Sequence, residues 1–194
     1  EKDGFDTLEQ ATPWLGPMTG VGLDSSEIGH PPTKFSRLFS ECRGLGLKLC
    51  MHAGEEGPPE YVRQALFDIG VDRIDHGNRA MEDPVLVDEI VSRGMGLTVC
   101  PLSNLSLKVI ERMEDSHVRQ MLDAGIAATI NSDDPAYFGG YMNANFEAVA
   151  TGLDLNAPEI IALARNGFTK SFLESATIAR HLSDIDQIDV THNR

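Results

Sequence analysis

Apolar residues along this chain alternate between helical and strand spacing. A stretch at 33–43 places them three and four positions apart, as on one face of a helix, and glycines at 44 and 46 end it. The same spacing recurs from Pro59 to a glycine at 70, from 83 to a glycine at 94, and over 116–124. The pattern predicts four amphipathic helices, the third of them capped by Asp83.

A short β-rich run follows each of these helices. The runs begin at residues 47, 71, 96 and 126, and a similar run covers 19–27. The glycines that close the helices stand at 46, 70, 94 and 125, a spacing that suits successive βα units of a parallel sheet. Beyond residue 135 the pattern predicts helices at about 143–151, 158–166 and 168–182.

Repeated βα units fit either an open doubly wound sheet or a closed barrel, and both are α/β folds. The open sheet favours a glycine-rich phosphate loop, and the sequence contains no GxGxxG or GxxxxGK[ST] motif. A (β/α)8 TIM-type barrel has eight strands in about 250 residues. Five strands therefore predict an N-terminally incomplete barrel, with about strands 4–8 and the C-terminal helices. No linker interrupts residues 1–194, so a single domain is expected.

Polar side chains follow four of the predicted strands where each strand ends. The carboxyl ends of barrel strands meet on one face, so residues distant in sequence can converge there. Histidine and carboxylate ligands suit zinc or a similar divalent metal, and metal-bound water ionises near neutral pH. The groups are His52 with Glu55, Asp75-His76-Gly77, Ser103-Asn104 and Ser132-Asp133-Asp134.

Each group also has a purely structural explanation. A single histidine at a strand end is usually a core or surface residue, and Glu55-Glu56 before a glycine is typical of a solvated turn. Asp133-Asp134 before a proline is a good turn or helix-capping signal. The position of all four groups after consecutive strands favours one shared site. The remaining histidines, at 30, 117, 181 and 192, are expected to be core or surface residues.

Composition and charge narrow the classes of function. The net charge is −14 at pH 7 and no basic cluster occurs, so no nucleic-acid partner is expected. No run approaches 18 consecutive apolar residues, so no membrane span is expected. The three cysteines are far apart and form no CxxC motif, which indicates reduced thiols and a cytoplasmic protein.

Four ordered motifs, "MHAGE", "RIDHG", "CPLSN" and "INSDDP", resemble the adenosine/adenine deaminase family, metal-dependent (β/α)8 barrels of the amidohydrolase superfamily. The resemblance extends from about Gly20 to about Phe172. The segment "GLDSSEIGHPP" is similar to the adenine deaminase branch, whereas the adenosine branch typically has an Ala-Gly-Asp-Glu segment there. The resemblance implies a zinc-dependent hydrolytic deamination in purine salvage, from adenine to hypoxanthine and ammonia.

The resemblance also implies a role for individual residues. His52 and Asp133 would be ligands of the single zinc ion. Glu55 would donate a proton to ring nitrogen N1, and His76 would orient and deprotonate the attacking water. Asp134 would bind the purine near N7. Asp75, Ser103 and Asn104 would support the site or shape its loops, and Glu56 is expected to be solvated.

One part of the family's metal site does not occur in this sequence. The family takes two more zinc ligands from a His-x-His pair on its first strand, and none of the six histidines here stand two apart. The chain alone is therefore expected to bind zinc weakly and to be inactive, and it could associate with itself through exposed sheet edges. The alternatives are a deaminase of adenosine or N6-substituted adenine, a non-catalytic fragment or binding module, and another metallohydrolase on the same barrel.

Overall fold

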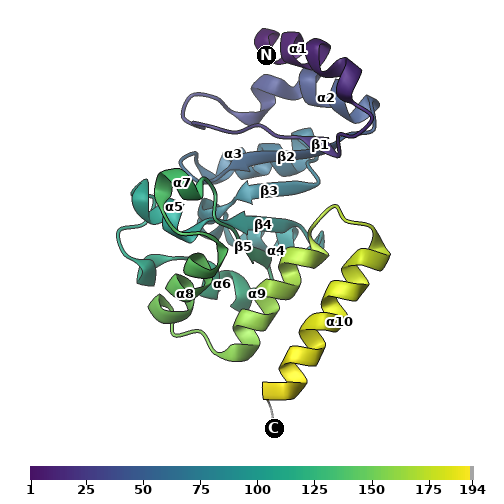
Figure 1. Cartoon of the computed structure of the whole chain (residues 1–194). Helices are drawn as coiled ribbons and strands as arrows, with labels where there is room; N and C mark the ends of the chain where they lie inside the picture. The colour runs from purple at the N-terminus through teal and green to yellow at the C-terminus, as the bar shows by residue number, and fades with distance from the viewer. Residues whose placement is uncertain (193–194) are drawn as a thin grey trace. The chain divides into compact units, whose positions relative to one another are not determined.

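The computed structural model describes the backbone of residues 1–192 and the side chains of residues 1–188 (Figure 1). The chain forms two compact units, Glu1–Leu86 and Val87–Arg194. The expectation that residues 1–194 form a single domain stays a prediction. The side chain of His192, expected to lie in the core or at the surface, is outside the described residues.

Three parallel strands form the sheet of the first unit, in the order β1, β2, β3. The register places His52 opposite Asp75 and Ala53 opposite His76. In β2 every residue except Lys48 and His52 is buried, as is usual for parallel strands covered on both faces. The elements of this unit are α1 (Lys2–Ala11), β1 (Gly20–Val21), α2 (Ser36–Gly44), β2 (Lys48–Ala53), α3 (Pro59–Arg63), β3 (Arg73–His76) and the start of α4 (Pro84–Ser92).

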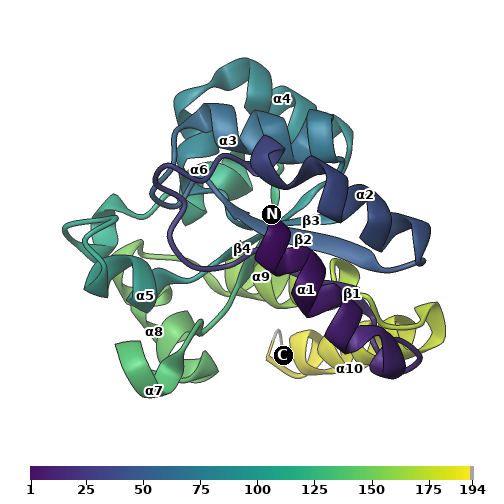
Figure 2. The same ribbon diagram turned by 90° about the horizontal axis from the view of Figure 1, so that it is seen from above.

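Helices α2 and α3 pack against β2 and confirm the first two predicted helices, with two local departures (Figure 2). A 3-10 turn at Pro32–Phe35 precedes α2, and a π-helix at Gln64–Ile69 continues α3. The two irregular segments are joined, because the Gln64 side chain accepts hydrogen bonds from the backbone and hydroxyl of Thr33. Gly70, with φ of 72°, then ends the second helical stretch.

The predicted start of α4 is confirmed. Asp83 Oδ1 accepts hydrogen bonds from the backbone N–H groups of Val85 and Leu86, at 3.1 and 3.2 Å, and Pro84 is the first helical residue. Its other oxygen accepts a hydrogen bond from Arg63 Nε at 2.9 Å. This hydrogen bond lowers the pKa of the Asp83 carboxyl, so the cap stays ionised and able to accept.

The second unit contains a parallel pair of strands that helices cover. Gly96 stands opposite Ala127 and Val99 opposite Ile130. Helices α6, α8 and α9 pack against β5, and α10 lies alongside α9 (Figure 1). The elements are β4 (Gly96–Val99), α5 (Pro101–Ser106), α6 (Val118–Asp123), β5 (Ala127–Ile130), α7 (Pro135–Phe138), α8 (Met142–Gly152), α9 (Ala157–Thr169) and α10 (Ser175–His192).

The predicted break between the last two helices was wrong in its position. Asn166 and Gly167 lie inside α9, which continues to Thr169, and α10 starts only at Ser175. The Asn166 side chain donates a hydrogen bond to the backbone oxygen of Ala128 at 2.9 Å, so it attaches the helix to β5 instead of ending it. Among the described residues, no helix is long and apolar enough to cross a membrane.

Candidate active site

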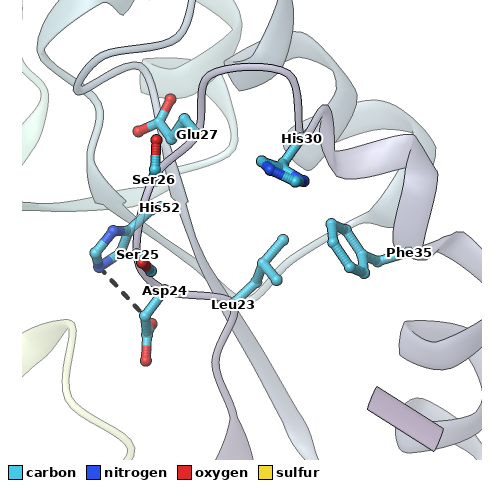
Figure 3. A pocket seen from close by; sticks show the side chains of 8 residues that line it. All are labelled: Leu23, Asp24, Ser25, Ser26, Glu27, His30, Phe35 and His52. Atoms are coloured by element: carbon cyan, nitrogen blue, oxygen red, sulfur yellow. Dashed lines mark ion pairs between the residues drawn. The ribbon is translucent and has the colours of Figure 1, made fainter. Parts of the chain in front are cut away.

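His52 lies near the carboxyl end of β2, with its ring only partly exposed. Its Nε2 atom is 3.7 Å from Asp24 Oδ1 (Figure 3). Its Nδ1 atom is buried and has no hydrogen-bond partner among the described residues. A buried ring nitrogen without a partner is costly unless something else binds it, which makes His52 a candidate ligand.

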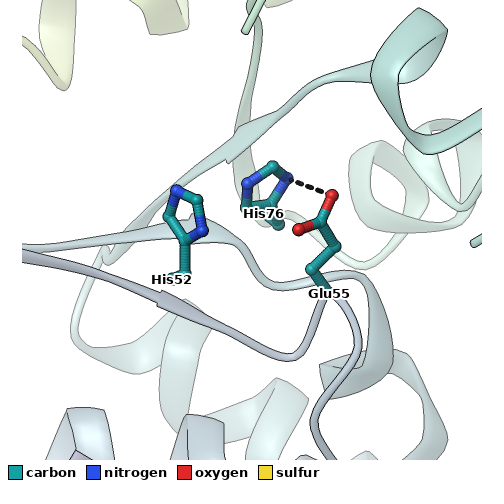
Figure 4. Close-up of side chains that lie close together, drawn as sticks. All are labelled: His52, Glu55 and His76. Carbon is teal, nitrogen blue, oxygen red and sulfur yellow. Dashed lines mark ion pairs between the residues drawn. The ribbon is translucent and has the colours of Figure 1, made fainter. Parts of the chain in front are cut away.

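Glu55 and His76 form a buried acid–imidazole contact beside this ring. The Glu55 side chain is 7% exposed and that of His76 only 2%, and His76 Nδ1 is 3.3 Å from Glu55 Oε1 (Figure 4). The rings of His52 and His76 meet edge to face, with their centroids 4.5 Å apart. The structure thus brings together His52 and His76, at the carboxyl ends of two neighbouring strands, and Glu55, in the turn after the first of them.

The local sequence explains how these side chains reach one another. Gly54 has a φ of 79°, which turns the chain sharply after β2 and returns Glu55 toward β3. His76 ends β3 with a φ of 65°, a conformation that few residues other than glycine adopt. The two turns direct the Glu55 and His76 side chains toward each other.

The same three residues match the donor set of a divalent metal. One ligand atom from each of His52, Glu55 and His76 lies within 4.8 Å of the other two. Imidazole and carboxylate donors are typical ligands of zinc. The unpartnered Nδ1 atom of His52 fits such a role, so the residues of this unit are compatible with the metal that the sequence predicts.

A pocket of about 240 Å³ opens beside His52 (Figure 3). The loop after β1 forms most of its wall. Leu23 and Phe35 offer apolar faces, and the other side chains are polar. The lining residues are Leu23, Asp24, Ser25, Ser26, Glu27, His30, Phe35 and His52.

Asp133 and Asp134 lie in the second unit, shortly after β5. Asp133 is partly buried and has a φ of 54°, whereas Asp134 is exposed and its backbone oxygen accepts hydrogen bonds from the first turn of α7. The two aspartates therefore differ in environment. Their participation in the site of the first unit stays a prediction.

The residues expected to support the site are buried or paired. Asp75 is 3.3 Å from Arg73 Nε. Ser103 and Asn104 are buried in α5, a helix that the sequence had suggested only as a polar strand end. The Asn104 backbone oxygen accepts hydrogen bonds from Val109 and Ile110, and the supporting roles of the Ser103 and Asn104 side chains stay predictions.

Glu27 is the residue that sequence reasoning missed. It is 4% exposed and accepts hydrogen bonds from the backbone N–H groups of Gly54, Glu55 and Gly57, each at 2.9 Å. The turn that carries Glu55 is therefore held by an acid from another segment. The available signal was a glutamate at the end of the β-rich run 19–27, which is too common to single out. Glu56 is exposed as expected, yet it accepts hydrogen bonds from the Ser26 hydroxyl and the Glu27 N–H.

Comparison with known proteins connects this arrangement to a family. The adenosine deaminase family profile matches residues 6–188. The adenine deaminase of Sphingopyxis alaskensis is 59% identical over 186 residues, which cover 96% of this chain and 54% of the relative. That of Acinetobacter baylyi is 50% identical and is covered to 57%. The chain thus spans about half the length of the curated relatives it matches.

Solved structures support the same assignment. The crystal structure of an adenine deaminase from Arthrobacter aurescens matches 96% of this chain and 57% of its own, with a TM-score of 0.93 and 42% identity. An amidohydrolase from Burkholderia ambifaria, with a TM-score of 0.89 at 22% identity, shares the fold. These matches confirm the predicted α/β class with the parallel βα units of a TIM-type barrel. The chain belongs to the adenosine deaminase family.

Proposed function

We propose that the protein containing this chain catalyses the hydrolytic deamination of adenine to hypoxanthine and ammonia. The observation that carries the proposal is the buried contact between Glu55 and His76 beside His52, in a chain at least 50% identical to several adenine deaminases. A buried acid next to an imidazole can move protons at a ring nitrogen and at water.

The preference for a free base over a nucleoside is supported by the curated adenine deaminases that are at least 50% identical to this chain. The pocket beside His52, of about 240 Å³, is lined by residues of the first unit. Apolar faces from Leu23 and Phe35 suit a flat aromatic ring, and the polar loop between them offers groups that can bind ring nitrogens.

The metal of the proposed reaction is one zinc ion. His52 would be a ligand through a ring nitrogen, and Asp133 would be another. When bound, zinc supplies a Lewis acid that makes water nucleophilic near neutral pH. Buried carboxylates and imidazoles around such an ion keep the ring orientations that ligation needs.

The chain's own residues perform the proton transfers. Glu55 in its acid form would donate a proton to ring nitrogen N1, which draws electrons from C6 as water attacks that carbon. His76 would accept a proton from the attacking water, and its contact with Glu55 holds the imidazole in place. Asp134 would accept a hydrogen bond from the purine near N7. The protonated His76 would pass its proton to the C6 amino group, which leaves as ammonia, and Glu55 would regain a proton from the C6 hydroxyl as the carbonyl of hypoxanthine forms, so one water is consumed for each base.

Ammonia release is the direct test. Adenine, adenosine and an N6-substituted adenine should be compared at equal concentration, with adenine turned over fastest. Faster turnover of adenosine or of the substituted base would identify that compound as the preferred substrate of the same deamination reaction. Binding of purine without ammonia release from any of them would favour a binding module.

We also propose that the chain by itself holds zinc weakly, because catalytic zinc needs three protein ligands and only His52 and Asp133 are assigned to the metal, whereas Glu55 and His76 are assigned to proton transfer. Bound metal and adenine turnover should be measured for this chain and for a form extended at its N-terminus. Equal zinc content and equal turnover in both forms would contradict the proposal. Sedimentation of the two forms would test the expected self-association.

A role in purine salvage and a reducing, cytosolic location complete the proposal. The location is supported by Cys42, Cys50 and Cys100, which are buried and form no disulfide bond. Growth on adenine as the purine source would test the role in salvage.

A further inference from the structure

Glu27 stands where two parts of the proposed site meet. It belongs to the loop that lines the pocket, and its carboxylate reaches beneath the turn that follows β2. An acid that is only 4% exposed must have its oxygens satisfied, because burying an unpaired charge is expensive.

Backbone donors of the turn satisfy both oxygens. Oε2 accepts from Gly54 N and Gly57 N, and Oε1 accepts from Glu55 N, all at 2.9 Å. Three N–H groups that converge on one carboxylate form charge-assisted hydrogen bonds, which are stronger than neutral ones. The turn 54–57 therefore takes its shape around the Glu27 side chain.

Contacts from both neighbouring segments also hold the turn 54–57 in place. Glu56 Oε2 accepts hydrogen bonds from the Ser26 hydroxyl and from Glu27 N, at 3.1 and 3.3 Å. From the other side, Arg79 N donates to the Gly54 backbone oxygen at 2.8 Å. The turn cannot shift without breaking contacts to the loop after β1 or to the segment after β3.

Gly57 shows how closely the carboxylate packs. A Cβ atom at this position would lie 2.5 Å from Glu27 Oε2 and 2.4 Å from Tyr61 Cδ2. Only glycine leaves room for the acid here. The sequence pattern Glu-Glu-Gly after His52 is thus explained by the contact with Glu27 as well as by the turn itself.

We propose that Glu27 is a positioning residue that holds the Glu55 turn in its reactive place and joins that turn to the substrate pocket. The inference rests on the proposed deaminase function. Glu27 itself need not contact the reacting atoms. It acts through the Glu55 backbone, whose N–H it binds, while the Glu55 carboxylate faces His76.

The test is the Glu27→Gln variant in the active protein, either this chain or a form extended at its N-terminus. The variant keeps the size of the side chain, but its NH2 group cannot accept a hydrogen bond from a backbone N–H. We expect kcat for adenine to fall roughly 10- to 100-fold, because a displacement of about 1 Å has this effect, with KM changed less than about threefold.

The kcat of a double variant distinguishes a positioning role from a general loss of structure. In a Glu55→Gln background the Glu27→Gln change should lower kcat by less than about threefold, because the residue it acts through is already disabled. Equal losses in both backgrounds would overturn the proposal. The exposed Glu60→Gln variant controls for the loss of one negative charge and should leave kcat unchanged.

Amide hydrogen exchange tests the contact without relying on activity. In Glu27→Gln the amides of Gly54, Glu55 and Gly57 should exchange faster by about tenfold or more, whereas the amides of Val85 and Leu86 should not change. Unchanged exchange at the turn would overturn the proposal. Should Glu27→Gln fail to fold, Gly57→Ala displaces the same carboxylate and should give the same pattern.

The two proposals fail in different ways. No ammonia from any purine in the parent protein would end both the deaminase function and the positioning role. Normal turnover in the parent with no effect of Glu27→Gln on kcat would end only the positioning role.

Discussion

Three residues proposed for the site or its pocket, Ser25, His76 and Asp133, have positive φ angles of 73°, 65° and 54°. L-residues seldom adopt this region, and each such position costs about 1 to 3 kcal/mol that the surrounding structure must offset. Strained backbone of this kind is frequent where a side chain must point in one direction for function. In His76 it turns the imidazole toward Glu55.

The two adjacent glutamates after Gly54 should differ sharply in their effect on catalysis. Glu55→Gln removes the proposed proton donor, so kcat for adenine should fall by about 10²- to 10⁴-fold. Glu56→Gln changes an exposed side chain that faces Ser26, and we expect a loss of less than about tenfold. Steady-state ammonia release from both variants is the measurement. Similar losses in the two would remove Glu55 from the role of acid.

Replacing Gly54 and Gly167 by alanine should change the free energy of unfolding in opposite directions. At Gly54 the φ of 79° and a new Cβ 2.5 Å from Val62 Cγ2 should destabilise the chain by about 1 to 3 kcal/mol. At Gly167, inside α9, the new Cβ meets no atom within 4 Å apart from the adjoining backbone of its own helix, so alanine should stabilise by up to about 1 kcal/mol. Urea unfolding compares the two. A neutral Gly54→Ala variant would contradict the strained turn.

At the scale of elements, periodicity predicted most of the helices and strands. All five β-rich runs became strands, because alternation and β-branching are local properties of the chain. The departures have tertiary causes. The π-helix after α3 is tied to Thr33, and α9 runs through Asn166 because its side chain bonds to β5. Neither contact is visible in a local window.

Strand β2 should make stability depend on pH through Cys50. Burial raises the pKa of this thiol to about 11 from a usual value of 9.0. Between these values the unfolded chain has lost the proton that the folded chain keeps. Stability should therefore fall as pH rises through this window, by up to about 2 to 3 kcal/mol.

Urea titrations of the parent and of Cys50→Ala at several pH values measure this effect. The variant has no thiol at this position and therefore lacks this pH dependence, while its smaller side chain lowers stability by a similar amount at every pH. The difference in stability between parent and variant should therefore shrink as pH rises through the window. Parallel curves across the whole range would show that Cys50 does not titrate as expected.

At the scale of the whole molecule, the net charge of −14 follows from the composition and does not depend on the fold. Like charges on a compact chain repel one another and lower the free energy of unfolding. Raising the salt concentration from about 10 mM to about 150 mM shortens the screening length from about 30 Å to about 8 Å. The urea midpoint should therefore rise with sodium chloride, and a falling midpoint would mean that attractive ion pairs dominate.

The sequence by itself determined the βα order, the glycine-ended helices and the four motifs that carry the family resemblance. These features depend on neighbours within a few positions. Because the motifs are local in the same sense, His52, Glu55 and His76 could be predicted as site residues from the sequence. Their individual roles remain proposals, because a motif names a residue without showing what it binds.

Only the tertiary structure decided which of these residues meet. The 3.3 Å contact of Glu55 with His76, the unpartnered nitrogen of His52 and the burial of Glu27 arise from packing between segments 20 to 30 positions apart. Local propensity carries no information about such pairs. From its local sequence alone, Glu27 would be expected to be solvated. Packing alone places Glu27 beneath the turn that carries Glu55.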